Sequence, residues 1–288
     1  MTSTHARTPS ASPILRLQNL LVYLAAAAIM VIFGFPVFWM VATSLKPLMS
    51  IGALEPVWLF WPVIDSYRQV LSDQPLTLML GNSAVIAVGS TIISVLLGSA
   101  AAYGMASRNM IGRPALTIWF LFQRAIPPVV MFVPLYVVFS KLGLLNTHIG
   151  MILAYTTFQL PFVVLMMLSF FDDLPAEIGE AARLDGCSML QRLRYIDLPL
   201  VAPGIAATTF FCLLFSWNEF IMAMIMTGPA TTTLPMAVNT YLFAFGAGSS
   251  VPWGPLSALG TIIILPAFAC TLLMQRYLVR GMTMGAVK

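Results

Sequence analysis

Residues 172–203 read DDLPAEIGEAARLDGCSMLQRLRYIDLPLVAP and differ in composition from the rest of the chain. This stretch holds nine of the 24 charged residues, and long apolar runs flank it on both sides. Its local signals predict two short helices joined at an elbow. Pro175 suits a first helical turn, and Gly186 is placed to end that helix. Ser188 and Gln191 have the capping-box spacing for the start of the second helix.

The outer limits of this elbow follow from the same stretch. Asp172 and Asp173 lie just upstream of the first helix, where a capping side chain is expected. Pro199 limits the second helix because proline has no amide hydrogen to donate. A charged, capped helical pair between apolar runs predicts a docking element. A solvated loop with helical propensity is the plainer alternative.

The flanking composition is that of a membrane protein. The chain has 288 residues, of which 59% are hydrophobic and only 8% charged, whereas a soluble domain has about 25% charged residues. A helix crosses the bilayer core with about 20 apolar residues. Four stretches without any charge exceed that length, namely 17–45, 74–107, 142–171 and 220–275. We therefore expect an all-α polytopic membrane protein.

Turn residues and apolar runs divide the chain into six predicted transmembrane helices. Prolines and glycines mark 227–256 as a loop, so the last long run holds one span and not two. The predicted segments are a disordered tail 1–18, a first transmembrane helix 19–45, an outer loop 46–75, a core 76–275 with spans at 80–106, 115–140, 149–171, 204–226 and 257–275 around the stretch 172–203, and a tail 276–288.

The distribution of basic residues predicts the orientation of these spans. Segments 1–18, 107–114, 172–203 and 275–288 together hold ten Lys and Arg residues, against three in the loops of the opposite side. Cytoplasmic segments carry the excess of positive charge. Both termini and the stretch 172–203 are thus predicted to be cytoplasmic. The sequence has no cluster of basic residues, so a nucleic-acid partner is not expected.

Two charged residues, Arg124 and Glu219, fall inside predicted spans. Such charges cost about 2.5–3.5 kcal/mol at mid-membrane and mark functional positions by default. Both lie at a similar predicted depth, so one interpretation is that they pair and fix helix packing. The other is that they line a hydrated pathway with Gln159, Trp217 and Asn218. An aromatic ring, amide groups and charged groups suit a polyhydroxylated solute, through ring stacking and hydrogen bonding.

Signatures of catalysis and of metal binding are absent from the sequence. It has no glycine-rich phosphate loop, no HExxH and no GxSxG motif. The three cysteines and two histidines do not have the spacing of a metal site. The chain is therefore not expected to hydrolyse ATP or to bind a cofactor, and energy for active transport must come from a partner or an ion gradient.

The segment Glu180-Ala181-Ala182-Arg183-Leu184-Asp185-Gly186, followed by Ile196, Leu198 and Pro199, resembles the EAA motif of inner-membrane permeases of ABC importers. Trp217-Asn218-Glu219-Phe220, residues 34–47 and the C-terminal residues 275–288 are similar to the carbohydrate branch of the type I importers, and in particular to the second permease of the maltose importer. The resemblance covers nearly everything after residue 18. Cys187 is a mild departure, because the family often has alanine there.

This resemblance implies a type I importer permease fold in the bacterial cytoplasmic membrane. It implies that the elbow is a coupling helix docked on an ATPase subunit, with ATP and magnesium bound by that partner. The implied partners are a second permease, two ATPase subunits and a solute-binding protein, with a sugar-like substrate. The expected ATPase contacts are Glu177, Glu180, Ala181, Ala182, Arg183, Asp185 and Gly186, with the small residues Gly179, Ala181 and Ala182 allowing a close approach.

Two other classes of function stay open from the residues themselves. A stand-alone secondary carrier would be driven by an ion gradient, although a single intramembrane carboxylate is thin support for it. A membrane-embedded enzyme would need a nucleophile and a base, and no such pair is evident. Dependence of transport on an ATPase partner distinguishes the importer from the carrier.

Overall fold

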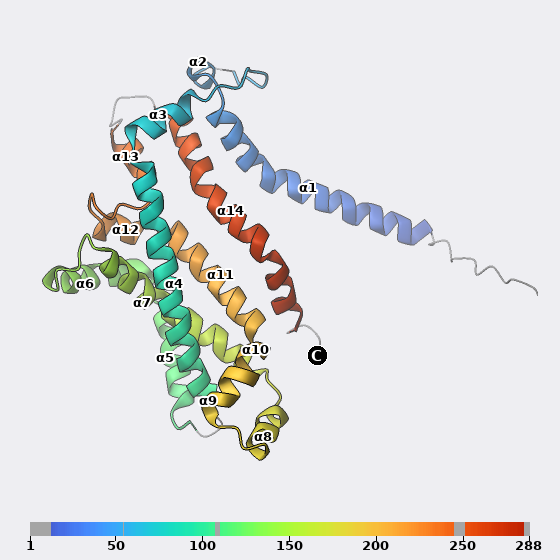
Figure 1. Cartoon of the computed structure of the whole chain (residues 1–288). Coiled ribbons are helices and arrows are strands. Elements are labelled where there is room, and N and C mark those ends of the chain that lie inside the picture. The colour runs from blue at the N-terminus through green and yellow to red at the C-terminus, as the bar shows by residue number, and fades with distance from the viewer. Residues whose placement is uncertain (1–12, 54, 107–109, 245–250, 285–288) are drawn as a thin grey trace, which may run out of the picture. The chain divides into compact units, whose positions relative to one another are not determined.

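The computed structural model describes residues 13–53, 55–106, 110–244 and 251–284, with side chains from residue 18 to residue 275 of these ranges. This part of the chain is helical and contains no strand (Figure 1). Contacts divide it into two compact units, residues 1–68 with 253–261 and residues 69–252 with 262–288. Most of the predicted N-terminal tail lies outside the described residues, and α1 begins at Pro13.

Long apolar helices dominate the described part. Four of them are long and apolar enough to cross a membrane, and two bent helix pairs raise the number to six if each pair counts as one span. The four helices are Gln18–Ser44, Leu76–Ala106, His148–Asp172 and Trp253–Gln275. The architecture is therefore the all-α, multi-span one that the sequence predicts.

The first unit contains α1 (Pro13–Ser44), α2 (Leu48–Ile51), the start of α3 (Asp65–Asp73) and the first turns of α14 (Trp253–Met284). The Ser44 and Tyr67 hydroxyls are 2.8 Å apart and share a hydrogen bond. Gly260 of α14 allows close contact with α1, because a Cβ there would lie 2.7 Å from the sulfur of Met40. These contacts fix the end of α1.

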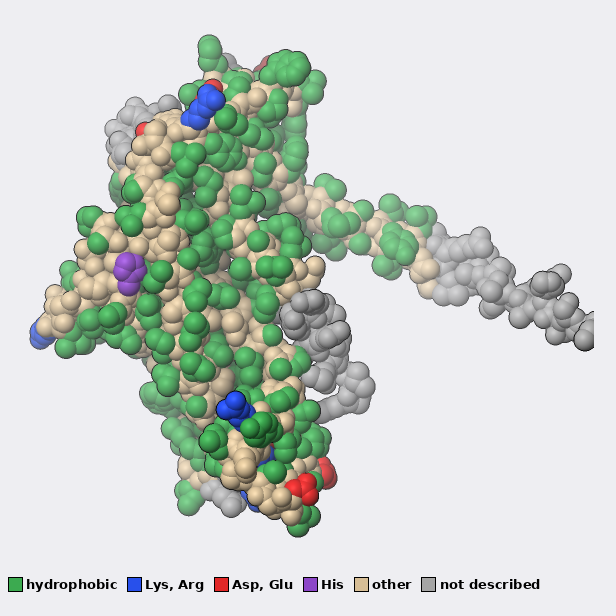
Figure 2. All heavy atoms as spheres, viewed as in Figure 1, with side chains coloured by type: hydrophobic (Ala, Val, Ile, Leu, Met, Phe, Trp, Pro, Cys, Tyr) green, Lys and Arg blue, Asp and Glu red, His purple; other side chains and the backbone are tan. Residues whose placement is uncertain are grey.

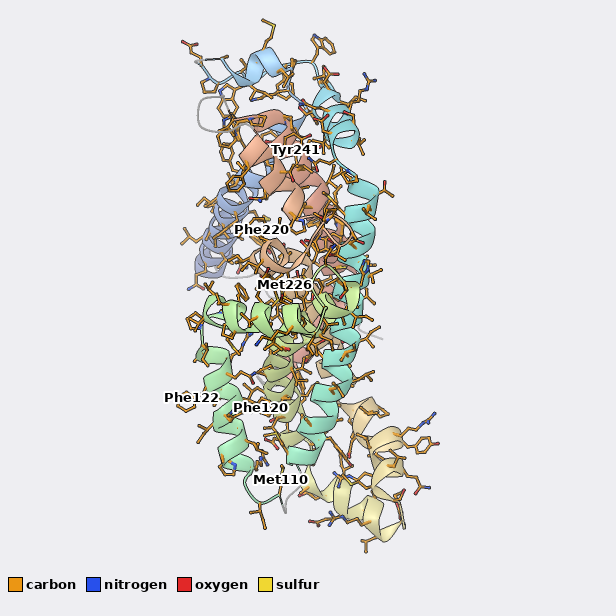
Figure 3. The ribbon with its side chains drawn as sticks, turned by 90° about the vertical axis from the view of Figure 1, so that its left-hand side faces the viewer. Met110, Phe120, Phe122, Phe220, Met226 and Tyr241 are labelled. Atoms are coloured by element: carbon orange, nitrogen blue, oxygen red, sulfur yellow. The ribbon has the colours of Figure 1, made fainter. Side chains whose placement is uncertain are left out.

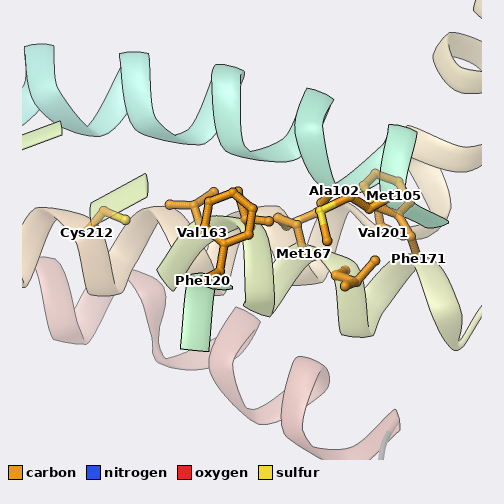
Figure 4. Packing of buried hydrophobic residues seen from close by; sticks show 10 residues of the cluster. Ala102, Met105, Phe120, Val163, Met167, Phe171, Val201 and Cys212 are labelled. Carbon is orange, nitrogen blue, oxygen red and sulfur yellow. The ribbon is translucent and has the colours of Figure 1, made fainter. Parts of the chain in front are cut away.

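The core of the second unit is formed by α4 (Leu76–Ala106), α7 (His148–Asp172) and α11 (Ala202–Asn218). Small residues along α4 allow close packing with α7, since a Cβ on Gly98 would lie 2.5 Å from Val163 Cγ1. Figure 4 shows the buried cluster between these helices, in which Phe120, Val163 and Met167 meet.

A sharp bend separates α5 (Arg113–Ala125) from α6 (Pro128–Lys141). The two helices meet at 95°, because Pro127 and Pro128 lack the amide hydrogens that would continue the helical ladder. The predicted span 115–140 is therefore two helices at an angle, with the break at its prolines. On α5, Phe120 is buried and Phe122 points away from the unit (Figure 3).

The predicted span 204–226 is also divided. It consists of α11 and the short α12 (Ile221–Met226), which are separated at Glu219 and Phe220 (Figure 3). The predicted loop 227–256 contains a further helix, α13 (Met236–Ala244), and the first turn of α14.

Side chains of α4 and of the loop before α7 hold the segment after α12 in place. Asn82 donates hydrogen bonds to the carbonyl oxygens of Ala230 and Thr232, at 3.1 and 3.0 Å. Asn146 accepts hydrogen bonds from the Gly228 amide and the Thr231 hydroxyl. This part of the predicted loop is therefore fixed to the helical core.

Candidate functional site

The elbow begins differently from its prediction. Asp172 is the last residue of α7, and Asp173 is the C-cap of that helix. The Asp172 carboxylate pairs with Arg113 at the start of α5, so neither aspartate caps the next helix. The next helix, α8 (Ala176–Leu184), has Pro175 as its N-cap residue. The prediction of an aspartate cap was wrong because α7 extends to the very start of the elbow.

The turn of the elbow forms as the sequence predicts. Gly186 has φ +77°, the left-handed conformation that favours glycine. The Cys187 amide donates to the Ala182 carbonyl and the Gly186 amide to the Arg183 carbonyl, which together form a Schellman motif. The predicted capping box of Ser188 and Gln191 then starts α9 (Met189–Arg192).

The second arm of the elbow contains a wide helical turn. After α9, residues Leu193–Asp197 form the π-helix η1, closed by a hydrogen bond from the Leu198 amide to the Leu193 carbonyl. The short helix α10 (Leu198–Leu200) follows and leads into α11. The chain bends by 73° between α9–α10 and α11.

The helix α8 has one buried and one exposed face. Gly179 and Ala182 face the interior of the chain and are buried, whereas Glu177, Glu180 and Ala181 are exposed. In the isolated chain Gly179 and Ala182 are covered by the chain itself, and their approach to a partner stays a prediction. Their small size lets α8 pack against its own chain.

An exposed apolar tip on the elbow was missed in the sequence. Leu184 is 89% exposed, and three further large apolar residues on the second arm are more than half exposed, namely Met189, Leu190 and Tyr195. Charged and apolar side chains share this surface over α8 and α9 (Figure 2). The signal that was available is the apolar pair Met189-Leu190 within an otherwise charged stretch.

Gln159 forms the centre of a buried polar cluster between α4, α7 and α11. Its amide nitrogen donates to the Ser216 hydroxyl and, at 3.3 Å, to the Cys212 carbonyl. The Ser90 and Ser216 hydroxyls are 2.9 Å apart. The Gln159 side-chain oxygen has no hydrogen-bond partner among the described residues.

Glu219 occupies the break between α11 and α12. Its carboxylate accepts hydrogen bonds from the Met222 and Ala223 amides at 3.0 and 3.2 Å. The Tyr155 hydroxyl donates a longer one of 3.4 Å. Glu219 therefore satisfies the free amides at the start of α12, as a capping residue does.

Arg124 does not pair with Glu219. The ion pairs between described residues include none that joins them. The Arg124 guanidinium lies over the rings of Phe162 and Phe215, at 5.0 and 5.6 Å from their centroids. An aromatic surface on α7 and α11 thus replaces the expected carboxylate as its neighbour.

The remaining two residues of the predicted pathway lie apart from Gln159. The Trp217 indole nitrogen donates to the Ile263 carbonyl of α14 at 3.0 Å. Asn218 is exposed and donates to the Leu214 carbonyl of its own helix. The structure brings together Gln159 and Glu219, and not Trp217 or Asn218.

Gln159 and Glu219 line one small cavity of about 110 Å³. Its other walls are largely aromatic and come from α6, α7 and α11, with Phe132, Phe158, Phe215 and Tyr155 among them. A second hollow of about 430 Å³ lies against the elbow, between α7, α8 and α9. No group of three His, Cys, Asp or Glu residues in the described part is arranged to hold a metal ion.

Comparison with protein families gives a match over most of this helical core. Residues 94–284 match the family described as binding-protein-dependent transport system inner membrane component. The chain belongs to this family. It is therefore a permease subunit of an ABC transport system, a transport component and not an enzyme.

Characterised relatives are similar to this permease along almost its whole length. The sulfoquinovosyl glycerol transport system permease protein SmoH of Agrobacterium fabrum is 34% identical, over 91% of this chain and 92% of the relative. The trehalose/maltose transport system permease protein MalG of Thermococcus litoralis is 31% identical, over 94% and 98%.

A solved structure shares the fold of the permease. A chain of a bacterial ABC transporter that imports the acidic polysaccharide alginate has a TM-score of 0.76 at 20% identity, covering 94% of this chain and 99% of that one. A further structure shows a bacterial alginate transporter in complex with a pentasaccharide-bound periplasmic protein, with a TM-score of 0.68. Both support the predicted type I importer permease fold.

Proposed function

We propose that this permease carries a sugar or a related polyhydroxylated solute across the bacterial cytoplasmic membrane, driven by ATP hydrolysis in partner subunits. The observation that most supports this proposal is the exposed apolar tip of the elbow, which offers a contact site for a partner subunit. Leu184, Met189, Leu190 and Tyr195 project from a charged element outside the predicted spans. Exposed apolar patches of this kind mark contact sites for other proteins.

The charged residues around this tip complete a docking surface for an ATPase subunit. Glu177, Glu180, Arg183 and Asp185 are exposed on α8 and at its end, and a polar rim around an apolar centre is the usual anatomy of an interface. Ala181 lies on the same exposed face. Gly186 contributes by fixing the angle of the elbow, while ATP and magnesium are bound by the partner.

The partners of the permease follow from its family. We infer a second homologous permease, two ATPase subunits and a solute-binding protein outside the membrane. The alginate transporter that shares the fold was solved with a bound periplasmic protein, which supports the last of these. The basic residues of 107–114 and 172–203 support an orientation with the elbow and both termini in the cytoplasm.

The names of the relatives support a carbohydrate-like solute. They are permeases for sulfoquinovosyl glycerol, diacetylchitobiose, trehalose and trehalose/maltose. The cavity is lined by Gln159 and Glu219 and has largely aromatic walls, which suit a hydroxyl group and the apolar face of a sugar ring. Arg124 faces the same aromatic side of α7 and α11.

The size of this cavity limits what it holds. Its volume of about 110 Å³ corresponds to only three or four water molecules at about 30 Å³ each. A disaccharide therefore does not fit in it as a whole. This permease contacts one part of the solute, and the second permease supplies the other contacts.

The docking of the ATPase is tested by placing a charge on the apolar tip. Leu184→Asp is expected to abolish co-purification of the ATPase subunit with the permease. Ile111→Asp is a matched control, because Ile111 is 98% exposed but lies outside the elbow. Retention of the ATPase by Leu184→Asp, at the level of the control, would contradict the proposed docking surface.

Transport itself is tested by uptake of radiolabelled trehalose into cells. Uptake is expected to require the ATPase gene and to persist when a protonophore removes the ion gradient. Uptake that persists without the ATPase and stops with the protonophore would instead indicate a secondary carrier. Unlabelled maltose and diacetylchitobiose, added in excess as competitors of labelled trehalose, show which of these sugars share the pathway.

A further inference from the structure

Arg192 connects the two arms of the elbow. It is the last residue of α9, and its Nε lies 3.0 Å from Oδ2 of Asp197. Asp197 is completely buried, with 0% exposure. On its other side, the guanidinium lies against α8, since a Cβ on Gly179 would be only 2.6 Å from Arg192 Nη1. One side chain thus fills the space between the α8 backbone and a buried carboxylate.

The π-turn makes this arrangement possible. In an α-helix, residues three or four positions apart share a face, and residues five apart do not. Arg192 and Asp197 are five positions apart, and the turn between them is closed by the π-type bond from the Leu198 amide to the Leu193 carbonyl. The wider turn brings the two side chains to the same face of the helix.

The other charges of this region are arranged around different partners. Arg113 pairs with Asp172. Both these residues and Glu180 and Arg183 line the hollow beside α8, together with Arg192 and Asp197. Among the ion pairs of described residues, that of Asp197 is with Arg192. Removing the partner of a buried carboxylate strongly destabilises the folded protein. The folded state therefore holds Arg192 tightly in this position.

Asp197 leads directly into the membrane-spanning part. It is followed by α10 and then by α11, which packs on α4 and α7 and ends at Asn218, next to Glu219 of the small cavity. A continuous mechanical connection therefore runs from the backbone of α8, through the Arg192 side chain and Asp197, to α11.

We propose that Arg192 is the positioning residue that makes α8 and α11 move as one body. The inference rests on the proposed function, in which a partner ATPase moves α8. Without Arg192, α8 is held to the second arm mainly by the backbone turn at Gly186, and displacement of α8 is not transmitted to α11. Arg192 itself touches neither ATP nor solute.

The rigidity of this connection is measured by pulsed EPR on the full-length permease. Nitroxide labels are placed at Leu184→Cys in α8 and Asn218→Cys at the end of α11, after replacement of the native Cys187, Cys212 and Cys270. Both labelled positions are exposed. The parent protein is expected to give one narrow distance distribution between the two labels.

Substitution of Gly179 tests the contact without touching the charge pair. Gly179→Ala places a methyl group where the guanidinium lies, so the distance distribution is expected to broaden. Gly104→Ala is the matched control, because Gly104 is also helical and nothing lies within 4 Å of its added Cβ. A distribution for Gly179→Ala as narrow as that of the control would overturn the proposal.

Arg192→Ala is expected to broaden the distribution as well. Adding Gly179→Ala to Arg192→Ala then has no further effect, because the methyl group no longer meets a guanidinium. Additive broadening in the double variant would contradict the proposal. Asp197→Asn keeps the shape of the buried side chain and removes its charge. It therefore replaces Arg192→Ala as the test variant if Arg192→Ala does not fold. A narrow distribution for Asp197→Asn would also contradict the proposal.

The consequence for transport is measured on the assembled transporter in vesicles. Arg192→Ala is expected to retain the ATPase subunits, since the docking surface is formed by other residues, and to lower trehalose uptake per ATP hydrolysed. An unchanged ratio of uptake to hydrolysis would overturn the proposed role of Arg192 but not the proposed function of the permease. If the parent permease itself fails to retain an ATPase, the proposed function fails, whatever the EPR result.

Discussion

At the scale of single residues, Glu219 shows how a carboxylate inside a membrane protein is stabilised by hydrogen bonds, with no ion pair to it among the described residues. The carboxylate accepts hydrogen bonds from the Met222 and Ala223 amides and from the Tyr155 hydroxyl. These donors are free because α11 ends at Asn218 and α12 begins at Ile221. Glu219 is therefore the residue that allows a broken helix at this position.

We expect Glu219→Ala to lower the stability of the permease substantially. The substitution leaves buried backbone donors without an acceptor, at about 1–3 kcal/mol for each unsatisfied group. Glu219→Gln keeps one acceptor oxygen and is expected to lose less. Thermal unfolding of the purified protein in detergent measures both effects.

The neighbouring Asn218→Ala is the control for this prediction. Asn218 is exposed, and its side chain donates a hydrogen bond to the Leu214 carbonyl of its own helix. Its substitution should change the unfolding temperature little. Equal unfolding temperatures for Glu219→Ala and Asn218→Ala would show that the capping role is wrong.

The sequence identified Glu219 and Arg124 as unusual but not their neighbours. Two charges at a similar depth make pairing a reasonable prediction, since depth follows from counting residues along a helix. The direction of each side chain depends on the rotation of its helix and on the break after Asn218. Neither is encoded in the local sequence, so the aromatic neighbours Phe162 and Phe215 of Arg124 were not foreseen.

At the scale of secondary structure, the turn of the elbow was predicted well because its signals are local. A Schellman turn at Gly186 and a capping box at Ser188 involve residues only a few positions apart. The two faces of α8 could not be distinguished from the sequence. Gly179 and Ala182 have the same pattern whether they approach a partner or their own chain, and only the position of Arg192 shows that Gly179 contacts its own chain.

We expect Gly186→Ala to destabilise the elbow. The backbone φ of +77° is unfavourable for a residue with a Cβ, by about 1–2 kcal/mol. The variant should insert into the membrane normally but retain less ATPase during purification, because the angle between the two arms is no longer fixed. Quantitative co-purification measures the loss.

Gly52→Ala is a suitable control for Gly186→Ala. Gly52 is also the residue after a helix end, at the C-cap of α2, but its φ is −85° and nothing lies within 4 Å of an added Cβ. Alanine is compatible with that conformation. A similar loss of ATPase in both variants would rule out conformational strain as the cause.

At the scale of the whole molecule, composition was sufficient to predict a multi-span helical protein. The long charge-free runs correspond to long apolar helices. The bends were not predictable in the same way. Pro127 and Pro128 interrupt the helical hydrogen bonds, but proline in the sequence does not specify the angle of 95° between α5 and α6.

The orientation in the membrane is tested by labelling single cysteines. In a variant without the native cysteines, Met49→Cys is expected to react with a membrane-impermeant maleimide only from outside intact cells. Leu184→Cys should react only in inside-out vesicles. Both positions are strongly exposed, at 93% and 89%, so access to the reagent depends on the side of the membrane. Reaction of both cysteines from the same side would disprove the predicted topology.

The π-turn at Leu193–Asp197 also limits how this chain tolerates recombination with its relatives. A chimaera that receives this segment from a permease with an uninterrupted α-helix loses the extra residue of the wide turn. Everything downstream then rotates by about 100°, the angle of one residue in an α-helix. Arg192 through Asp197 must therefore be kept together as one unit, along with Gly179, or the recombined chain loses its register.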